Sequence, residues 1–493
     1  MWIDLDSRSA HKRPQSSFRT HKQEGLQAKI HQLRTELEQF YQQPAGLIQM
    51  ACEDAVRRIE ELEALRCTAE TWILVDMDMF YVAVEIRERP KLAMQPVAVV
   101  FNGMITASNY VARRFGVKSG TPLHLAEKRC PNMVQIASRM EKYKAASREV
   151  RAVLSEYDPL METKGLDEAY LLVTKLLLRR GTNNDAGRVA LAEEIRGKVY
   201  SKTGMTASAG IGCNKLIAKI CSEVNKPNGQ FYLRPEAEDI RRFMSDLDVS
   251  EIPKVGKVLK ELLTSIGIST CRQVLEYAAK IAAGFPHTIS TMLFNSALGI
   301  GTSDHSERIE DQRSLSVCHT FPPTSEPRLL EEHMRVFCDQ LEAQLSERTA
   351  GCRTVTVFYK TESFQELSKS ETGQGVLDKR DDIWRVAGKL LRGLYPIQSV
   401  RMLGCRLSRL VYSKEQQHAS GQLIQTRLTQ TPPKPVAISK KQKQRQAGDQ
   451  DLFQALMNSS ILPNHPLTMP EKTVCHESEE DGPRKRSFQG LFG

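Results

Sequence analysis

The spacing of hydrophobic residues changes several times along the chain, and each change marks an expected element. The first 23 residues are polar and basic, so we expect them to be poorly ordered. From Glu24 the apolar residues recur every three to four positions, which predicts an amphipathic helix carrying Leu26, Ile30, Leu33, Leu37 and Phe40. The stretch ACEDAVRRIEELEALR predicts a second helix. Both precede the first expected strand, so they should form an extension that packs on, or wraps around, the rest of the protein.

The remainder of the chain divides into three patterned regions and a tail. Between about residues 72 and 245, strand-like runs (WILVDMDMF, PVAVVF, AYLLVT, TASAGIG) alternate with helical ones, which indicates an α/β or α+β core. A helical period follows, with Gly256 and Gly267 as breaks. Residues 313–411 hold three strand-like stretches separated by two amphipathic helices, which predicts a separate α+β unit. After Tyr412 the chain is rich in Gln, Lys, Ser and Pro and should be largely disordered.

Composition limits the class of protein. A chain of 493 residues exceeds what one hydrophobic core usually supports, so two to four domains are expected. An excess of 69 Lys and Arg over 59 Asp and Glu suggests a polyanionic partner, with a merely soluble basic protein as the alternative. The 11 cysteines are odd in number and form no C-x-x-C pair, which argues for reduced thiols in an intracellular compartment. Without a secretory signal or an apolar run of about 18 residues, no membrane partner is expected.

Two carboxylates, Asp76 and Asp78, interrupt the apolar run WILVDMDMFYVAVE. A solvated turn is one explanation, but a carboxylate at the end of a buried strand loses hydration and needs a cation. Asp167 and Glu168 stand in a similar setting, before the apolar run of ETKGLDEAYLLVT. Together with Asp76 they could hold two divalent ions about 3.5 to 4 Å apart, an arrangement that catalyses phosphoryl transfer.

Five segments carry a specific resemblance. VDMDMFYVAVE, ASNYVARRFGV, LDEAY, SAGIGCNKLIAKICSEVNKPNGQ and IPKVGKVLKELLTSIGI resemble, in order and spacing, the signature segments of Y-family translesion DNA polymerases, above all those of the DinB and kappa branch. The resemblance covers about residues 71–411 and implies an α+β right-hand polymerase. Its parts would be an N-terminal extension (1–70), palm (71–79 and 140–245), fingers (80–139), thumb with a helix-hairpin-helix (246–310), little finger (313–411) and disordered tail (412–493).

The resemblance implies template-directed addition of deoxynucleotides to a primer, opposite damaged or distorted template, by two-metal nucleotidyl transfer. The partners would be primer-template DNA and deoxynucleoside triphosphates, and the cofactor two Mg²⁺ ions, for which Mn²⁺ can substitute. Asp76, Asp167 and Glu168 would be the catalytic metal ligands, completed by the backbone carbonyl of Met77, while Asp78 would accept local hydrogen bonds. The alternative is a catalytically impaired DNA-binding scaffold of the same fold. A nucleotidyl cyclase could share the paired carboxylates but would lack the thumb and little finger.

The same resemblance assigns the nucleotide contacts. Phe80 and Tyr81 would lie below the incoming sugar, with the ring of Tyr81 excluding a ribose 2′-hydroxyl; ordinary packing at a helix start is the alternative. Tyr110 and Arg113 are three residues apart, hence on one helix face, and with Lys226 they match the phosphate contacts. The roof over the templating base would comprise Met104, Ser119 and Gly120.

Three departures from the family pattern are Gly165, Met79 and the GIGCNK step. They bear on the fine geometry and the rate rather than the reaction class, because none removes a ligand.

DNA contacts are expected in two further places. Backbone N–H groups of Val255, Gly256 and Lys257 could meet a phosphate at a helix N-terminus. Arg353 and Lys360 flank an expected strand of the little finger, where phosphate contacts and a solvated edge both remain open.

The end of the chain, PRKRSFQGLFG, carries two short signals. Pro483 to Arg486 resembles a nuclear import signal or a solvated charge cluster, so the nucleus is expected, with the mitochondrion as the alternative. The spacing of Phe488, Leu491 and Phe492 resembles a sliding-clamp-binding peptide, with Lys485 where glutamine is common. An isolated aromatic tail is the alternative.

Overall fold

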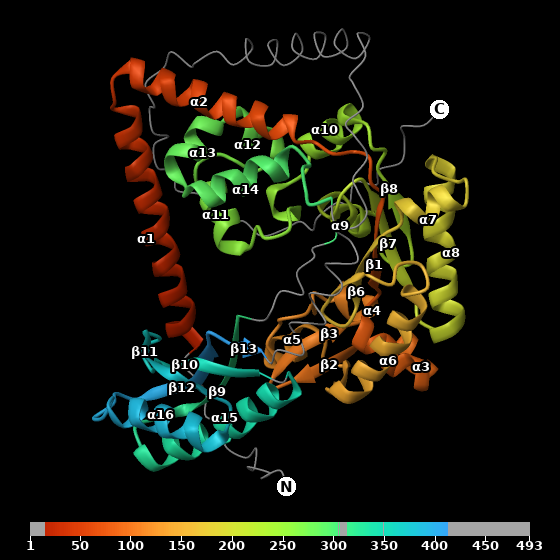
Figure 1. Cartoon of the computed structure of the whole chain (residues 1–493). Helices are drawn as coiled ribbons and strands as arrows, with labels where there is room; N and C mark the ends of the chain where they lie inside the picture. The colour runs from red at the N-terminus through yellow and green to blue at the C-terminus, as the bar shows by residue number, and fades with distance from the viewer. Residues whose placement is uncertain (1–14, 304, 306–312, 349, 413–493) are drawn as a thin grey trace. The chain divides into compact units, whose positions relative to one another are not determined.

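The computed structural model describes residues 15–303, 305, 313–348 and 350–412, with side chains from residue 23 onward (Figure 1). The described chain combines helices with three separate sheets, which confirms the α+β class. None of the described helices is long and apolar enough to cross a membrane.

The central sheet has the strand order β5-β6-β1-β7-β8. Its strands are β1 (Trp72–Met77), β5 (Glu162–Lys164), β6 (Glu168–Leu172), β7 (Ala207–Gly212) and β8 (Gln230–Tyr232). Strand β1 is antiparallel to both β6 and β7 and is buried along its whole length, which explains the apolar run from Trp72 to Val75. The helices of this part are α3 (Phe80–Glu88), α6 (Met140–Leu154), α7 (Thr174–Arg179), α8 (Asp185–Thr203) and α9 (Lys215–Val224).

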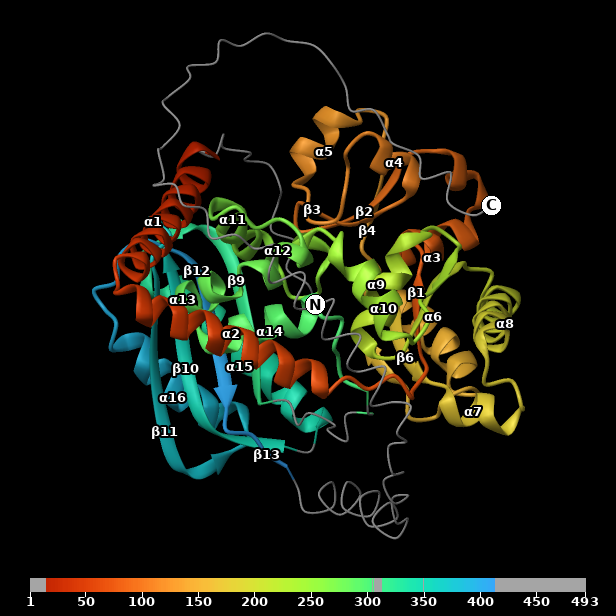
Figure 2. The same cartoon turned by 90° about the horizontal axis from the view of Figure 1, so that it is seen from above.

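A small sheet, β3-β2-β4, lies within the insertion between β1 and α6, and Figure 2 shows it with its helices α4 and α5. Its elements are η1 (Pro90–Met94), β2 (Val97–Phe101), β3 (Met104–Ser108), α4 (Tyr110–Arg114), α5 (Leu123–Arg129) and β4 (Val134–Ala137). It has its own apolar core, which includes Ala98, Ile105, Ala112, Val117 and Ala126.

A helical region follows the central sheet. It comprises α10 (Ala237–Ser245), η2 (Val249–Glu251), α11 (Lys257–Ser265), α12 (Cys271–Glu276), α13 (Ala278–Gly284) and α14 (His287–Ala297). The N-terminal helices α1 (Gln15–Tyr41) and α2 (Ala45–Ala64) pack on it, α1 against α11 and α13, and α2 against α13 and α14. Leu33 and Leu37 are buried there, and the Arg34 guanidinium donates to the Ser265 carbonyl at 3.1 Å. The extension therefore packs on the body as predicted, although α1 begins at Gln15, earlier than its apolar spacing indicated.

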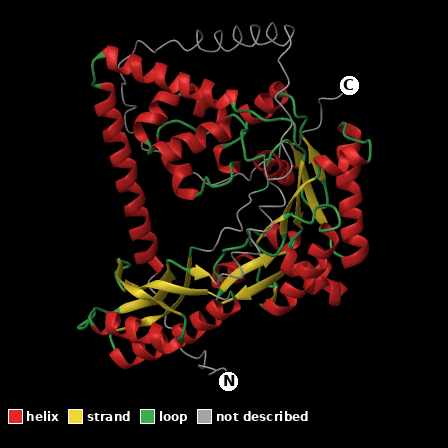
Figure 3. Ribbon diagram, viewed as in Figure 1, coloured by secondary structure: helices red, strands yellow, loops and turns green. Residues whose placement is uncertain are grey.

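The C-terminal sheet has the order β11-β10-β12-β9, with helices α15 and α16 packed against it (Figure 3). Its elements are β9 (Ser314–Thr324), α15 (Pro327–Glu347), β10 (Ala350–Thr361), β11 (Glu366–Leu377), α16 (Arg380–Arg392), β12 (Val400–Ser408) and β13 (Val411–Tyr412). The sequence patterns identified β9, β10 and β12 but missed β11, whose residues are nearly all exposed and carry no apolar alternation.

Helix α9 lies unusually close to β7 because β7 contains glycines. A Cβ atom at Gly210 would lie 2.0 Å from the Ala218 carbonyl oxygen and 2.3 Å from the Ser222 amide nitrogen. These are backbone atoms of α9, so no side-chain rotation could relieve the clash. The helix is also anchored at its start, where the Asn214 side chain accepts from the Ile217 amide at 2.9 Å.

We therefore predict that Gly210→Ala separates α9 from the central sheet and destabilises the protein by about 1 to 3 kcal/mol or more. Gly197→Ala is the matched control, because Gly197 lies in α8 and its added methyl would meet nothing within 4 Å. That control should be neutral or stabilising by up to about 1 kcal/mol. Melting curves of both variants test the prediction, and equal melting temperatures for Gly210→Ala and the wild type would contradict it.

Candidate active site

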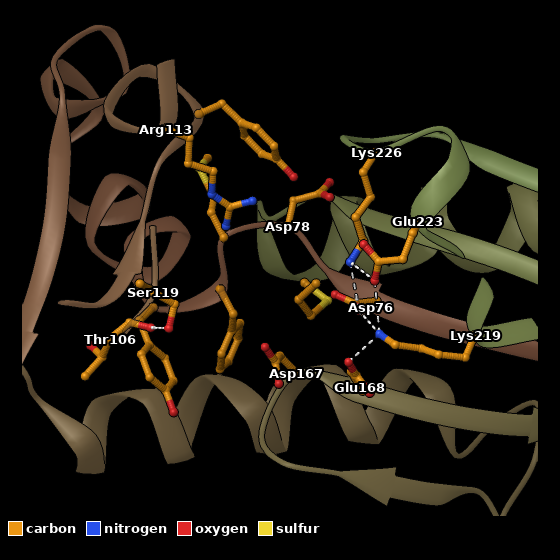
Figure 4. A pocket seen from close by; sticks show the side chains of 16 residues that line it. Asp76, Asp78, Thr106, Arg113, Ser119, Asp167, Glu168, Lys219, Glu223 and Lys226 are labelled. Atoms are coloured by element: carbon orange, nitrogen blue, oxygen red, sulfur yellow. Dashed lines mark hydrogen bonds and ion pairs between the residues drawn. The ribbon is translucent and has the colours of Figure 1, made fainter. Parts of the chain in front are cut away.

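A pocket of about 350 Å³ opens between the carboxyl end of β1, the small sheet and α9 (Figure 4). Its lining comprises Asp76, Met77, Asp78, Met79, Phe80, Tyr81, Thr106, Ala107, Tyr110, Arg113, Ser119, Asp167, Glu168, Lys219, Glu223 and Lys226. The predicted metal ligands, sugar contacts and phosphate contacts all belong to this lining. Four distant parts of the chain thus supply one site.

The pairing of β1 with β6 brings the carboxylates together. Asp76 pairs directly with Glu168, and the Met77 amide donates to the Asp167 carbonyl at 2.9 Å. Asp76 is only 6% exposed, so its charge cannot be hydrated as in free water. The strand register therefore places three acids at one end of the central sheet, as the sequence predicted.

Two lysines neutralise these acids. The Lys219 ammonium lies 2.9 Å from an Asp76 carboxylate oxygen and 2.6 Å from a Glu168 oxygen. The Lys226 ammonium also lies 2.9 Å from Asp76. Glu223 of α9 is 3.1 Å from Lys219 and 2.9 Å from Lys226, which follows the helix. Sequence reasoning missed Lys219 and Glu223, although their four-residue spacing is that of one helix face.

The surrounding charges shift the pKa values of Asp167 and Asp76 in opposite directions. Burial, together with the negative charges of Asp76 and Glu168, raises the pKa of Asp167 to about 6. Burial would also raise the pKa of Asp76, but Lys219 and Lys226 outweigh it and lower that pKa below its ordinary value. In turn, Asp76 and Glu168 raise the pKa of Lys219 despite its burial. Asp167 is thus the acid that the lysines compensate least.

The donor set fits a hard divalent cation, because carboxylate and carbonyl oxygens are the ligands that Mg²⁺ prefers. Asp76, Asp167, Glu168 and the Met77 carbonyl supply such oxygens around the pocket. Within the described residues, however, no group of three or more His, Cys, Asp or Glu side chains already has the spacing of a metal site. The Lys219 ammonium stands between two of the carboxylates, Asp76 and Glu168 (Figure 4).

Asp78 points away from this cluster and has a different role. It is 2% exposed and accepts from the Ser208 hydroxyl at 2.8 Å and from the Asn228 amide at 2.9 Å. The Arg196 guanidinium donates to the Asn228 side chain at 2.8 Å from the other side. These bonds hold the Pro-Asn-Gly turn that follows Lys226, so Asp78 is a local hydrogen-bond acceptor as expected.

Phe80 and Tyr81 begin helix α3, and a second ring supports Tyr81. Tyr81 stacks on Tyr143 with ring centres 4.5 Å apart and planes 12° apart. The Tyr143 hydroxyl donates at 2.9 Å to Glu85, which is fully buried and also contacts the Arg139 guanidinium. The Tyr81 ring is therefore held from behind by a buried polar network that sequence reasoning did not identify.

Tyr110 and Arg113 lie on one face of α4, as their spacing predicted. They contact each other, with the Arg113 guanidinium 4.6 Å from the centre of the Tyr110 ring. The Arg113 Nε also donates to the Ser108 carbonyl at 3.1 Å, which fixes the arginine at the pocket wall.

Of the three residues predicted to form the roof over the templating base, one lines this pocket. Ser119 lines it and donates to the Thr106 carbonyl at 2.8 Å, whereas Met104 and Gly120 are not in the lining. Thr106 and Ala107 occupy the wall instead. Gly120 has a φ of +79°, a conformation that favours glycine, and an added Cβ there would meet nothing within 4 Å.

The predicted phosphate-binding amides also need correction. The amides of Val255 and Gly256 donate to the carbonyls of Ile252 and Lys254, at 3.0 and 3.1 Å. Lys257 is the first residue of α11, whose opening amides have no partner within the helix. Of the three predicted amides, those of Val255 and Gly256 are therefore already engaged in local hydrogen bonds.

The remaining predicted contacts are those of the little finger with DNA and those of the chain's end with a clamp. Arg353 and Lys360 lie within β10, and the Lys360 ammonium is 2.7 Å from Glu366 of the adjacent strand β11. Phe488, Leu491 and Phe492 lie outside the described residues.

Two family models match the chain. The model described as the impB/mucB/samB family matches residues 75–223, and the model of that family's C-terminal domain matches residues 312–422. The first match contains every proposed residue of the pocket except Lys226.

Curated relatives include eukaryotic and bacterial polymerases. The chain is 36% identical to DNA polymerase kappa of Arabidopsis thaliana, over 72% of this chain and 52% of that protein. It is 28% identical to DNA polymerase kappa of Homo sapiens, over 80% of this chain and 54% of that protein. With DNA polymerase IV 2 of Agrobacterium fabrum it shares 34% identity over 70% of this chain and 95% of that protein. The chain therefore spans about half the length of the plant and human relatives.

The solved structures that resemble this chain are also DNA polymerases. A Y-family DNA polymerase chimera, Dbh-Dpo4(243-245)-Dbh, is 26% identical and matches 70% of this chain with a TM-score of 0.62. The insertion ternary complex of Dbh DNA polymerase matches the same share with 26% identity and a TM-score of 0.50.

The raised pKa of Asp167 predicts how stability depends on pH when no divalent cation is present. The folded protein holds the Asp167 proton up to about pH 6, against an ordinary value of 3.8, so the stability linked to this proton is lost as pH rises through about 6. Asp167→Asn removes the charge and should stabilise the protein by on the order of 1 kcal/mol at about pH 7.5. Melting curves in a chelator at about pH 7.5 and pH 5 test this, because the gain should shrink at the lower pH. A gain of equal size at both values would contradict the charge explanation.

Proposed function

Because the chain belongs to the Y family of DNA polymerases, in the branch that includes DNA polymerase IV and DNA polymerase kappa, we propose that it is a translesion DNA polymerase. It adds deoxynucleotides to a primer opposite damaged or distorted template. The observation that carries the proposal is one pocket that combines Asp76, Asp167 and Glu168 with the cationic groups of Arg113 and Lys226.

The parts of a right-hand polymerase correspond to the observed elements. The central sheet with α6–α10 is the palm, the small sheet with α3, α4 and α5 the fingers, and α11–α14 the thumb. The C-terminal sheet is the little finger, which holds the primer-template, and Lys257 opens the phosphate-binding helix of the thumb. The helices α1 and α2 reinforce the thumb from its outer side, since they pack directly on α11, α13 and α14.

Two divalent cations, Mg²⁺ with Mn²⁺ as a substitute, are the proposed cofactor. Asp76, Asp167, Glu168 and the Met77 carbonyl would hold them. When bound, such ions stabilise the charge of a transferring phosphoryl group and lower the pKa of the attacking hydroxyl.

The cationic wall of the pocket binds the triphosphate. Arg113 is fixed by the Ser108 carbonyl and by the Tyr110 ring, so its guanidinium is positioned before the nucleotide arrives. Lys226 is held by the turn that Asp78 anchors, and its ammonium exchanges Asp76 or Glu223 for phosphate oxygens. These groups neutralise the pyrophosphate that leaves.

The opposite wall selects the sugar. The Tyr81 ring, backed by Tyr143, leaves no room for a ribose 2′-hydroxyl, so deoxynucleotides are preferred by steric exclusion. The alternative of a catalytically impaired DNA-binding scaffold is disfavoured because every proposed ligand is intact and the buried carboxylates are costly to retain.

Two proposals concern the protein's place in the cell. The enzyme works in the nucleus, in keeping with the basic run at Pro483 to Arg486 and with its similarity to eukaryotic DNA polymerase kappa. Its terminal Phe488, Leu491 and Phe492 bind a sliding clamp, which would raise the polymerase's effective concentration at the primer end.

Primer extension tests the catalytic assignment. With Mg²⁺ present, Asp167→Asn should lower extension by about 10³-fold or more, because it removes a ligand of the reacting centre. DNA affinity should stay within about twofold, since phosphate contacts elsewhere dominate binding. Glu193→Gln, an exposed acid of α8 outside the pocket, is the matched control and should retain activity. Undiminished extension by Asp167→Asn would refute the assignment.

Sugar selection is tested by a pair of Tyr81 variants. Tyr81→Ala opens the space beside the sugar and should raise ribonucleotide insertion relative to deoxynucleotide insertion by at least about tenfold, equivalent to about 1.4 kcal/mol. Tyr81→Phe keeps the ring and should leave the ratio unchanged. The ratio is measured from single-nucleotide insertion kinetics, and a selectivity unaffected in Tyr81→Ala would place the gate elsewhere.

Clamp binding is tested on a peptide covering Pro483 to Gly493. We expect the labelled peptide to bind the eukaryotic sliding clamp, and a version carrying Phe488→Ala and Phe492→Ala to lose that binding, because the aromatic rings supply the apolar contact. Fluorescence anisotropy measures both. Equal binding by the two peptides, or none by either, rules the motif out.

A further inference from the structure

Lys219 has a position that the proposed roles of the other pocket residues do not explain. Its ammonium makes three contacts with carboxylates from three elements, at 2.9 Å to Asp76, 2.6 Å to Glu168 and 3.1 Å to Glu223 (Figure 4). An ammonium has three N–H donors, so these contacts use its full capacity. The distances are those of charge-assisted hydrogen bonds.

The contacts of Lys219 overlap with the proposed cation ligands. The same Asp76 and Glu168 side chains would hold a divalent cation, and Lys219 already occupies Oδ2 of Asp76 and Oε1 of Glu168. A cation that binds at those two oxygens therefore displaces Lys219 from them. Lys219 can leave both without losing every partner, because Glu223 lies one turn away on the same helix and is not a proposed ligand.

Glu223 is suited to receive the lysine. Its side chain is 44% exposed, so its charge is partly hydrated whether or not it is paired. It already contacts both Lys219 and Lys226. Its position on α9 is fixed by the close packing of that helix on β7.

We propose that Lys219 is the internal counter-ion of the active site: it neutralises Asp76 and Glu168 before a divalent cation binds and transfers to Glu223 when the cation arrives. The inference rests on the proposed two-cation function. Lys219 is a positioning residue in this account, because it acts on the ligands and not on the substrate. It stabilises the cation-free protein and at the same time weakens cation binding, since each cation must displace it.

The pattern of charge compensation supports this role. Lys219 contacts Asp76 and Glu168 but not Asp167. The lysine thus compensates the two acids that face it and leaves the third available as a first contact for a cation.

The test measures Mn²⁺ binding by the full chain without DNA or nucleotide, from the electron paramagnetic resonance signal of free Mn²⁺. Lys219→Met keeps the length of the side chain and removes its charge, so Mn²⁺ should bind about tenfold more tightly. Glu223→Gln removes the charge of the partner to which Lys219 would transfer, which should keep the lysine on Asp76 and Glu168 and weaken Mn²⁺ binding severalfold. The two variants thus move the dissociation constant in opposite directions.

Lys215→Met is the matched control. Lys215 lies one turn earlier on α9, where its ammonium is 2.6 Å from Glu162 and lies over the Trp72 ring. The control should leave Mn²⁺ affinity unchanged. In a chelator, Lys219→Met should melt below the wild type, and saturating Mn²⁺ should remove that difference.

The outcomes separate this inference from the proposed function. Unchanged or weaker Mn²⁺ binding by Lys219→Met, or tighter binding by Glu223→Gln, overturns the counter-ion role. If Lys219→Met does not fold, the Glu223→Gln result decides alone. If the wild type binds Mn²⁺ through Asp167 and extends primers while Lys219→Met binds no more tightly, the inference fails and the proposed function stands. If the wild type extends no primer, the proposed function fails, whereas the Mn²⁺ titrations still report on Lys219.

Discussion

The concentration of negative charge at the end of a buried strand is the constraint on which the rest of the site depends. Strand β1 is buried along its length, and its pairing with β6 sets Asp76 opposite Glu168 with Asp167 adjacent. Three acids so close together, with little water, repel one another unless cations lie between them. The fold therefore has to bring positive charge to this point before any substrate arrives. Lys219 and Lys226 supply it, and both are carried by α9 and the turn that follows.

The close packing of α9 on β7 determines where that positive charge lies. Gly210 allows backbone contact between the helix and the strand, and Asn214 caps the helix at its start. Beyond the C-terminal end of α9, the Asn228 amide donates to Asp78, and this bond fixes the turn that bears Lys226. The glycine-containing strand, the capped helix and the turn are consecutive in sequence, so one short segment of the chain supplies and orients both lysines that contact Asp76. The segment from β7 to the turn after α9 therefore sets the charge around Asp76, although Asp76 lies on β1, far away in the sequence.

The sequence predicted those parts of the structure whose signal is local. The apolar run around Asp76 identified β1, and the spacing of Tyr110 and Arg113 identified a shared helix face, because both patterns are set by neighbouring residues. Strand β11 was missed because its exposed, polar residues lack the alternation of a half-buried strand. The ion pairs of Lys219 were missed for a different reason, since they depend on strand register and on helix packing that no single segment encodes. Gly120 lies outside the lining of this pocket, and its positive φ is a backbone property that the sequence pattern does not reveal.

The two walls of the pocket differ in how firmly their groups are held, and this difference fits the proposed chemistry. On the carboxylate wall, Lys219 has a choice of partners, so its contacts can rearrange as charge enters the site. On the opposite wall, Tyr81 stacks on Tyr143, which is bonded to the fully buried Glu85, and a buried carboxylate paired with Arg139 has no solvated alternative. Sugar selection would then rest on a rigid ring, while metal binding and the phosphate contact of Lys226 would rest on exchangeable ion pairs. A polymerase that accepts distorted templates gives up part of its selection by base-pair shape, so a sugar check that does not depend on the template is the part that must stay rigid.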